Sequence, residues 1–242
     1  KKYMKKMGPE ELVGMLIQPI LWVLIFSKGM ASMMGGANGG GGEYLSFMLP
    51  GIMALTALGG AIGGGFTWLS ERNSGLVREY WVAPVPRIGI LLGNSLANIS
   101  KSLLQTVAIV VVGLLAGAVF STSLWGVLGS VALVAGFGLG FGGIALAIAS
   151  SIDNEGGFHA IIMLLNLPLL FLSNALYALE TLPRWMQGAA KINPTSYLVD
   201  GVRQLMMSAG GDFPLWLCFT VVLGFGFLCL LLSVAVFRKS QQ

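Results

Sequence analysis

Residues 45–69 form an apolar stretch without a single charged side chain, and this feature limits the folds open to the chain more than any other. A helix needs about 20 apolar residues to cross the hydrocarbon core of a bilayer. Charged residues make up only 10% of the 242 residues, whereas soluble domains carry about 25%. We therefore expect an all-α polytopic membrane protein, and not a cytosolic enzyme, a secreted disulfide-rich domain or a disordered tail.

Charged residues and turn formers divide the sequence into six apolar segments that are long enough to span a membrane. We expect six transmembrane helices over about 12–30, 45–69, 88–120, 124–150, 160–176 and 214–237, within one transmembrane domain that comprises residues 1–242. Residues 177–213 are too polar to span but rich in Trp, Tyr, Leu and Met, which is typical of short helices at the membrane interface.

The distribution of Lys and Arg predicts how these spans are oriented. With six spans and an inner N-terminus, nine basic residues fall on the inner side and three on the outer side. The inner residues are Lys1, Lys2, Lys5, Lys6, Arg72, Arg78, Arg87, Arg238 and Lys239, and the outer ones are Arg184, Lys191 and Arg203. Because basic residues concentrate on the cytoplasmic side, we expect both termini in the cytoplasm, residues 70–87 as a cytoplasmic loop and residues 177–213 outside.

Polar residues inside the predicted spans have two interpretations. Gln18, Asn166, Ser173 and Asn174 lie close to prolines in the first and fifth spans. Polar groups are unfavourable in lipid unless they face protein or water. These four residues therefore either line a substrate path or form interhelical hydrogen bonds beside proline kinks.

A second polar set recurs along the third span. Asn94, Asn98, Lys101 and Gln105 follow one another at spacings of four, three and four residues, so they share one face of a helix. We interpret this face as an amphipathic stretch at the interface that continues from the preceding loop, and the alternative is that it faces a wet interior.

Small residues recur every four positions in several spans, which lets helix backbones approach closely. The pairs are Gly59/Gly63, Gly60/Gly64, Gly113/Gly117, Gly136/Gly140 and Gly138/Gly142. We interpret them as packing sites within one subunit, and the alternative is a seam between two subunits.

The sequence contains no convergent set of acids, bases or metal ligands, so we predict no catalytic residue, metal site or bound cofactor. It also lacks the G-x-x-x-x-G-K-[ST] loop that binds nucleotide phosphates. If ATP powers this protein, another chain must bind it. An ion-coupled secondary transporter would need carboxylates in mid-membrane, yet the second, fourth, fifth and sixth spans contain none.

The loop between the second and third spans reads SERNSGLVREYWVAPVPR over residues 70–87. Its pattern predicts a short amphipathic helix over 71–81, which Pro84 and Pro86 would end. Such a helix either rests on lipid headgroups or inserts into a groove of a cytoplasmic partner.

Two blocks of residues resemble ABC-2 type transporter permeases. The first comprises Glu71-Arg72, Gly75, Arg78-Glu79, Pro84, Arg87 and Gly93, and the second comprises 167–176, 182–185 and Asn193-Pro194 with Tyr197, Asp200 and Arg203. Gln18-Pro19 with Leu21-Trp22 fits as well. The resemblance covers nearly the whole chain and is closest to the branch of daunorubicin-type drug exporters and nodulation-factor exporters. Ala178 departs from it, where many members carry proline.

The resemblance implies the type V exporter-like fold, with a cytoplasmic coupling helix, short external helices before the last span, and an interfacial amphipathic helix over residues 1–11. Two permease subunits, forming a homodimer, would work with two separate ATPase subunits that bind ATP and Mg. The residues that would contact the ATPase are Glu71, Arg72, Gly75, Arg78, Glu79 and Tyr80.

A second group, Asn193, Pro194, Tyr197, Asp200 and Arg203, we interpret as structural residues of the external helices. We expect helix caps among them, and an ion pair between Asp200 and Arg203, which lie three residues apart.

We therefore expect a transport subunit, not an enzyme, that exports a hydrophobic or amphipathic substrate across the plasma membrane of a prokaryote. Its partners would be the ATPase, a second permease and the bilayer, with no nucleic acid. The alternatives are an exporter of lipid-linked polysaccharide and, in a different class, an ion-coupled secondary transporter.

Overall fold

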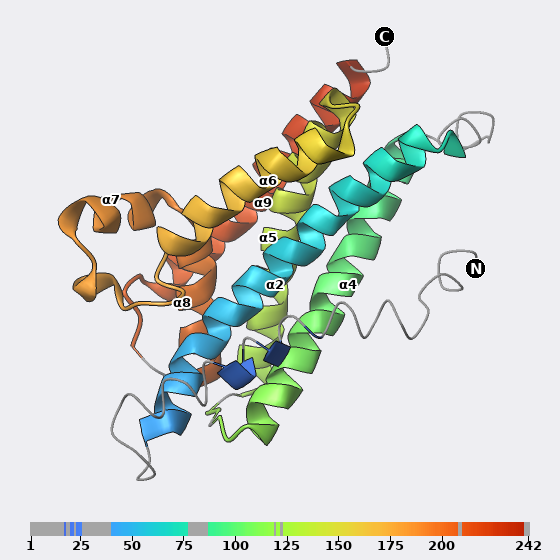
Figure 1. The fold of residues 1–242 in the computed structure, drawn as a ribbon. Coiled ribbons are helices and arrows are strands. Elements are labelled where there is room, and N and C mark those ends of the chain that lie inside the picture. Colours follow the sequence, from blue (N-terminus) through green and yellow to red (C-terminus); the bar gives the residue numbers. More distant parts are fainter. Residues whose placement is uncertain are drawn as a thin grey trace.

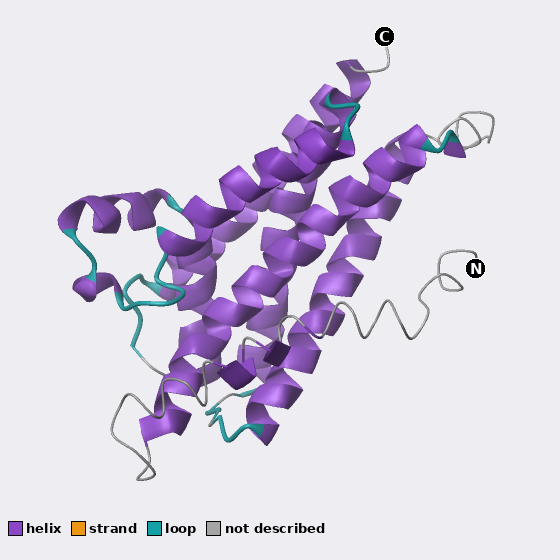
Figure 2. Cartoon of the chain, viewed as in Figure 1, coloured by secondary structure: helices purple, strands orange, loops and turns teal. Residues whose placement is uncertain are grey.

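The computed structural model describes residues 17, 20–21, 23–25, 40–76, 87–118, 120–121, 123–207 and 210–239. Within these residues the chain forms helices joined by loops, without a strand (Figure 2). The helices are α2 (Gly40–Asn73), α4 (Arg87–Leu115), α5 (Leu124–Ser151), α6 (Glu155–Phe171), η1 (Leu179–Thr181), α7 (Arg184–Ile192), α8 (Pro194–Met207) and α9 (Leu215–Lys239). The expectation of an all-helical chain is therefore confirmed for the described residues.

Four of the described helices are long and apolar enough to cross a membrane. These spans cover 45–73, 93–115, 124–151 and 215–236, while α6 is apolar but only 17 residues long. Figure 1 shows that the C-terminal ends of α2, α5 and α9 lie at the same end of the bundle as the starts of α4 and α6. We call this the loop end, because residues 70–76 lie there, and the opposite end, towards which α8 lies, the cap end.

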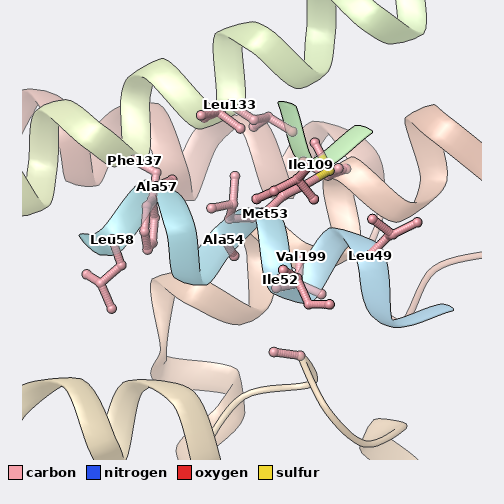
Figure 3. Close-up of a cluster of buried hydrophobic side chains, with 14 of the residues drawn as sticks. Leu49, Ile52, Met53, Ala54, Ala57, Leu58, Ile109, Leu133, Phe137 and Val199 are labelled. Atoms are coloured by element: carbon pink, nitrogen blue, oxygen red, sulfur yellow. The ribbon is translucent and has the colours of Figure 1, made fainter. Parts of the chain in front are cut away.

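Helix α5 occupies the centre of the bundle and packs against α2, α4, α8 and α9. Figure 3 shows the core between these helices, with Met53 and Ala57 of α2 near Leu133 and Phe137 of α5, while Ile52 lies on the side of α2 away from α5. These five side chains are at most 2% exposed. Since lipid tails are as apolar as these side chains, close packing rather than expulsion of water holds such helices together.

Glycines allow α5 and α9 to approach at backbone distance. A Cβ atom added at Gly143 would lie 2.9 Å from the carbonyl oxygen of Cys229, and one added at Gly226 would collide with the carbonyl oxygen of Gly136. The glycine pair Gly136/Gly140 therefore packs within the subunit. Gly59 and Gly63 differ, because an added Cβ would meet no atom of the described residues within 4 Å.

The polar face of α4 is directed at α2. The side-chain amide of Asn94 donates a hydrogen bond to the carbonyl of Gly64 (3.4 Å), and the hydroxyl of Ser102 donates to the carbonyl of Ala57 (3.4 Å). Asn98 donates to the side-chain oxygen of Asn94 at 2.9 Å. Asn94 of the predicted polar set therefore bonds to α2 and Asn98 to Asn94, within the long helix α4, while the position of this stretch at the membrane interface stays a prediction.

Several helix ends differ from the predicted span boundaries, and local capping explains two of them. α6 covers 155–171 instead of 160–176, since the side chain of Asn154 accepts a hydrogen bond from the Gly156 amide and starts the helix earlier. α4 ends at Leu115 instead of residue 120, followed by Gly117 with a φ of 94°. Most of the predicted first span and the 1–11 helix lie outside the described residues.

The close contact of α5 and α9 generates a matched test on one helix. We expect Gly226→Ala to lower the free energy of unfolding by about 1–3 kcal/mol, because the added methyl group overpacks a backbone contact. Gly224→Ala, two residues away with no atom within 4 Å of the added Cβ, should leave stability unchanged or slightly raised. Thermal unfolding of both purified variants in detergent measures the difference, and equal stability would contradict the packing described here.

Candidate functional site

Arg72 lies in the last turn of α2 and binds the C-terminal end of α5. Its Nη1 donates hydrogen bonds to the carbonyls of Ala149 (3.2 Å) and Ser150 (2.9 Å). Its Nη2 donates to the carbonyl of Ile152 (2.7 Å) and forms an ion pair with Asp153. The guanidinium thus joins two helix ends that lie 77 or more residues apart in the sequence.

This arrangement satisfies a general need of helix ends. The last carbonyls of a helix have no partner within the helix, and they form the negative end of the helix dipole. A cation with several donors is therefore well suited to the end of α5. The side-chain amide of Asn73 adds a bond to the carbonyl of Asp153 at 3.2 Å.

The residues expected to contact an ATPase are partly described. Glu71 and Arg72 belong to the last turn of α2, instead of beginning a separate helix over 71–81, and Gly75 follows in a turn with a φ of 78°. A residue without a side chain adopts this left-handed conformation without strain. The remaining three residues of this set, Arg78, Glu79 and Tyr80, lie outside the described residues.

A second cluster lies at the cap end, where Asp200 of α8 is fully buried. One of its carboxylate oxygens accepts a hydrogen bond from the amide of Asp212 (3.1 Å). The other accepts from the amide of Phe213 (2.9 Å) and from the side-chain amide of Gln204 (2.9 Å). Asp200 therefore fixes the segment that leads into α9 onto α8.

Arg203 joins α8 to α2. Its Nη2 donates to the carbonyls of Asn174 (3.1 Å) and Phe47 (3.4 Å), and the guanidinium lies 4.0 Å from the centre of the Phe47 ring. Burial lowers the pKa of Arg203, while the nearby carboxylates of Asp200 and Asp212 act in the opposite direction. We call Asn174, Asp200, Arg203, Gln204 and Asp212 the cap-end polar cluster.

The expected Asp200–Arg203 ion pair is not formed. In the part of the chain that the structure describes, the ion pair within contact distance is that of Arg72 with Asp153. Asp200 and Arg203 share one helix, but each binds backbone groups of a different neighbour: Asp200 those before α9, and Arg203 those of α2 and of the turn after α6. The Asp200 carboxylate still acts on Arg203 electrostatically, without a direct contact.

Asn193 lies between α7 and α8 and binds the end of α6, so it connects these three helices. Its side-chain nitrogen donates to the carbonyls of Leu169 and Leu172, both at 2.9 Å, at the end of α6. Its side-chain oxygen accepts from the Thr195 amide (2.9 Å), which is a cap on α8. Pro194 then occupies the first position of α8, where its missing N–H costs nothing.

Tyr197 also connects α7 with α8. Its hydroxyl donates to the carbonyl of Lys191 at 2.7 Å, and its ring stacks near that of Phe213. Burial raises the pKa of Tyr197.

Four residues were predicted either to line a substrate path or to form structural hydrogen bonds, and the structure describes three of them, in α6 and in the turn after it. Ser173 and Asn174 lie in the turn after α6 and not in a span, and the Asn174 side chain donates to Asp212 at 3.1 Å. Asn166 is half-buried within α6 itself. Gln18 lies outside the described residues.

Sequence reasoning missed Phe47, Asn73 and Asp153 as members of these contacts. Asp153 carried a usable signal, since Asp153-Asn154-Glu155 separates two apolar runs and has the pattern of a helix start. Phe47 carried none, because it is one apolar residue among many. Within the described residues, no three His, Cys, Asp or Glu side chains gather into a possible metal site.

The buried carboxylate gives a second test. We expect Asp200→Ala to lower the free energy of unfolding by about 2–4 kcal/mol, because it leaves the amides of Asp212 and Phe213 without an acceptor and removes one of the two carboxylates near the buried Arg203. Asp153→Ala is the matched control, as that side chain is fully exposed and should cost about 1 kcal/mol or less. Chemical unfolding followed by circular dichroism measures both, and equal losses would contradict the central position of Asp200.

Comparison with known proteins identifies the family. The family model described as ABC-2 type transporter matches residues 4–207. The chain is 25% identical over 237 residues to the daunorubicin resistance ABC transporter permease protein DrrB1 of Streptomyces coeruleorubidus, covering 96% of this chain and 81% of that protein. It is 29% identical to the putative transport permease ycf38 of Pyropia yezoensis (85% and 70% covered) and 26% identical to nodulation protein J of Bradyrhizobium diazoefficiens (97% and 88% covered). The chain therefore belongs to the ABC-2 type transporter family, as a membrane-spanning transport permease.

Proposed function

We propose that this chain is the permease subunit of an ATP-driven exporter that moves a hydrophobic or amphipathic substrate out of the cytoplasm. The family match over residues 4–207 is the observation that carries this proposal. Relatives named for daunorubicin resistance, doxorubicin resistance and nodulation support export as the direction. The apolar, glycine-rich spans support a substrate that tolerates apolar surroundings.

The proposed topology has six spans with both termini in the cytoplasm of a prokaryote, across whose plasma membrane transport takes place. The described helices support it, because their alternating directions bring residues 70–76, the start of α4 and the end of α9 to one end of the bundle (Figure 1). Basic residues at this end include Arg72, Arg87, Arg238 and Lys239. The loop end would then be cytoplasmic and the cap end external.

The proposed energy source is a separate ATPase subunit that binds ATP and Mg and docks on the loop end. Two observations support this proposal: residues 70–87 contain several charged side chains, and this segment joins two long helices, α2 and α4. The ATPase would contact Glu71, Gly75, Arg78, Glu79 and Tyr80. A second copy of the permease would complete the pathway, as the family resemblance implies.

A co-purification experiment tests the proposal. A tag after Gln242 would recover the chain from native membranes in mild detergent, and the eluate would be assayed for ATP hydrolysis. We expect a stoichiometric ATP-binding protein with vanadate-sensitive activity. Recovery of the permease without any ATPase activity would overturn the proposal and restore the ion-coupled alternative.

Charge reversal at the two ends of the bundle localises the docking surface. We expect Arg78→Glu, in the loop, to reduce the amount of co-purified ATPase several-fold, because opposite charge at a docking surface disfavours the complex. Arg184→Glu is the control, since Arg184 is an exposed residue of α7, near the cap end. Equal recovery of the ATPase with both variants would exclude the loop as the docking surface.

A further inference from the structure

We infer that Arg72 is a positioning residue that fastens the docking loop to the end of α5, and not a contact for the ATPase. This inference rests on the proposed function, in which residues 70–87 receive the ATPase. It concerns how a movement of that loop reaches the centre of the membrane domain. It departs from the role that the family resemblance assigns to Arg72.

The hydrogen bonds of Arg72 support this role. Both Nη atoms are engaged, with three backbone carbonyls and one carboxylate as acceptors. The Arg72 side chain is 26% exposed, whereas that of its partner Asp153 is 100% exposed. The four acceptors match the four N–H donors of the two Nη atoms, so these donors are used within the chain and are directed at the end of α5.

The carbonyls contribute more than the ion pair. An ion pair with a fully exposed carboxylate is screened by water and contributes little. Hydrogen bonds from a cation to partly buried carbonyls are stronger, and they act at the negative end of the α5 dipole. Arg72 thus holds the backbone of residues 149–152 directly, and Asn73 holds the carbonyl of Asp153 beside it.

The position of α5 explains why this attachment matters for transport. α5 packs against α2, α4, α8 and α9 (Figure 1). Towards α8 the contact is close, since a Cβ atom added at Gly201 would lie 2.7 Å from the Leu133 side chain. Close-packed protein interiors have low compressibility, so a displacement of one helix is passed on to the helices packed against it. A displacement of the loop that pulls on Arg72 therefore moves α5, and through it α8, which carries Asp200, Arg203 and Gln204 of the cap-end polar cluster.

The first test uses the permease alone and does not depend on the ATPase. We expect Arg72→Gln to raise the hydrogen-exchange rate of the amides in residues 148–152 about tenfold, because the last turn of α5 loses its cap. Arg184→Gln, which neutralises an exposed arginine of α7, should leave that rate unchanged. Asp153→Asn should change it less than threefold. An unchanged rate in Arg72→Gln would overturn the inference, whatever the function of the protein.

The second test uses the complex with the ATPase, reconstituted in lipid vesicles. We expect Arg72→Gln to bind the ATPase with unchanged affinity and to hydrolyse ATP, but to transport severalfold less substrate per ATP. Arg72→Lys should restore part of the coupling, because a lysine can still bond one carbonyl. A loss of ATPase affinity in Arg72→Gln would instead identify Arg72 as a direct contact and overturn the inference. If the wild-type chain binds no ATPase, the proposed function fails, while the exchange result still decides the role of Arg72 in the fold.

Discussion

The backbone groups at helix ends are the constraint on which the rest of this structure depends. A helix leaves its first four amides and last four carbonyls without partners, and where these groups are buried they need a partner from the protein itself. The chain meets this need with polar side chains from distant segments. Arg72 binds the end of α5, Asn193 binds the end of α6, and Asp200 binds the amides that precede α9. Each of these side chains also joins two elements, so the same hydrogen bonds cap a helix end and hold the tertiary structure together.

The middle of the bundle is held by a different principle. Between spans there is little hydrophobic gain, because lipid and protein are equally apolar, so contact area and close approach decide stability. Gly143 and Gly226 bring α5 against α9 in this way, and Gly64 leaves room for Asn98 between α2 and α4. In such a bundle, one apolar side chain can replace another at many positions. At the close helix contacts, however, few glycines can be replaced by a larger residue.

These two principles explain how much the sequence could predict. The apolar runs predicted α2, α5 and α9 closely, because spanning length depends on composition, which is directly readable. The start of α6 was misplaced, since the cap by Asn154 overrides the apolar pattern. The prediction of an Asp200–Arg203 ion pair is wrong. Spacing along a helix shows which side chains are neighbours, but not which backbone groups of other elements bind them instead. The contact of Arg203 with Phe47 depends on the packing of α8 on α2, about which neither residue type carries local information.

Among the described residues that carry the family resemblance, several lie at helix ends or bind them. Arg72 lies at the end of α2 and Asn193 precedes α8. Asp200 and Arg203 lie within α8 and bind the amides before α9, the turn after α6 and the carbonyl of Phe47 in α2. This placement follows from the physics, because apolar residues in a span can replace one another, whereas a cap needs a particular donor or acceptor at a particular place. Under the proposed function, a side chain that caps one helix from another would transmit movement between them, as inferred for Arg72 at the loop end. The cap-end residues join helices in the same way, so the same physical need places specific side chains at both ends of the bundle.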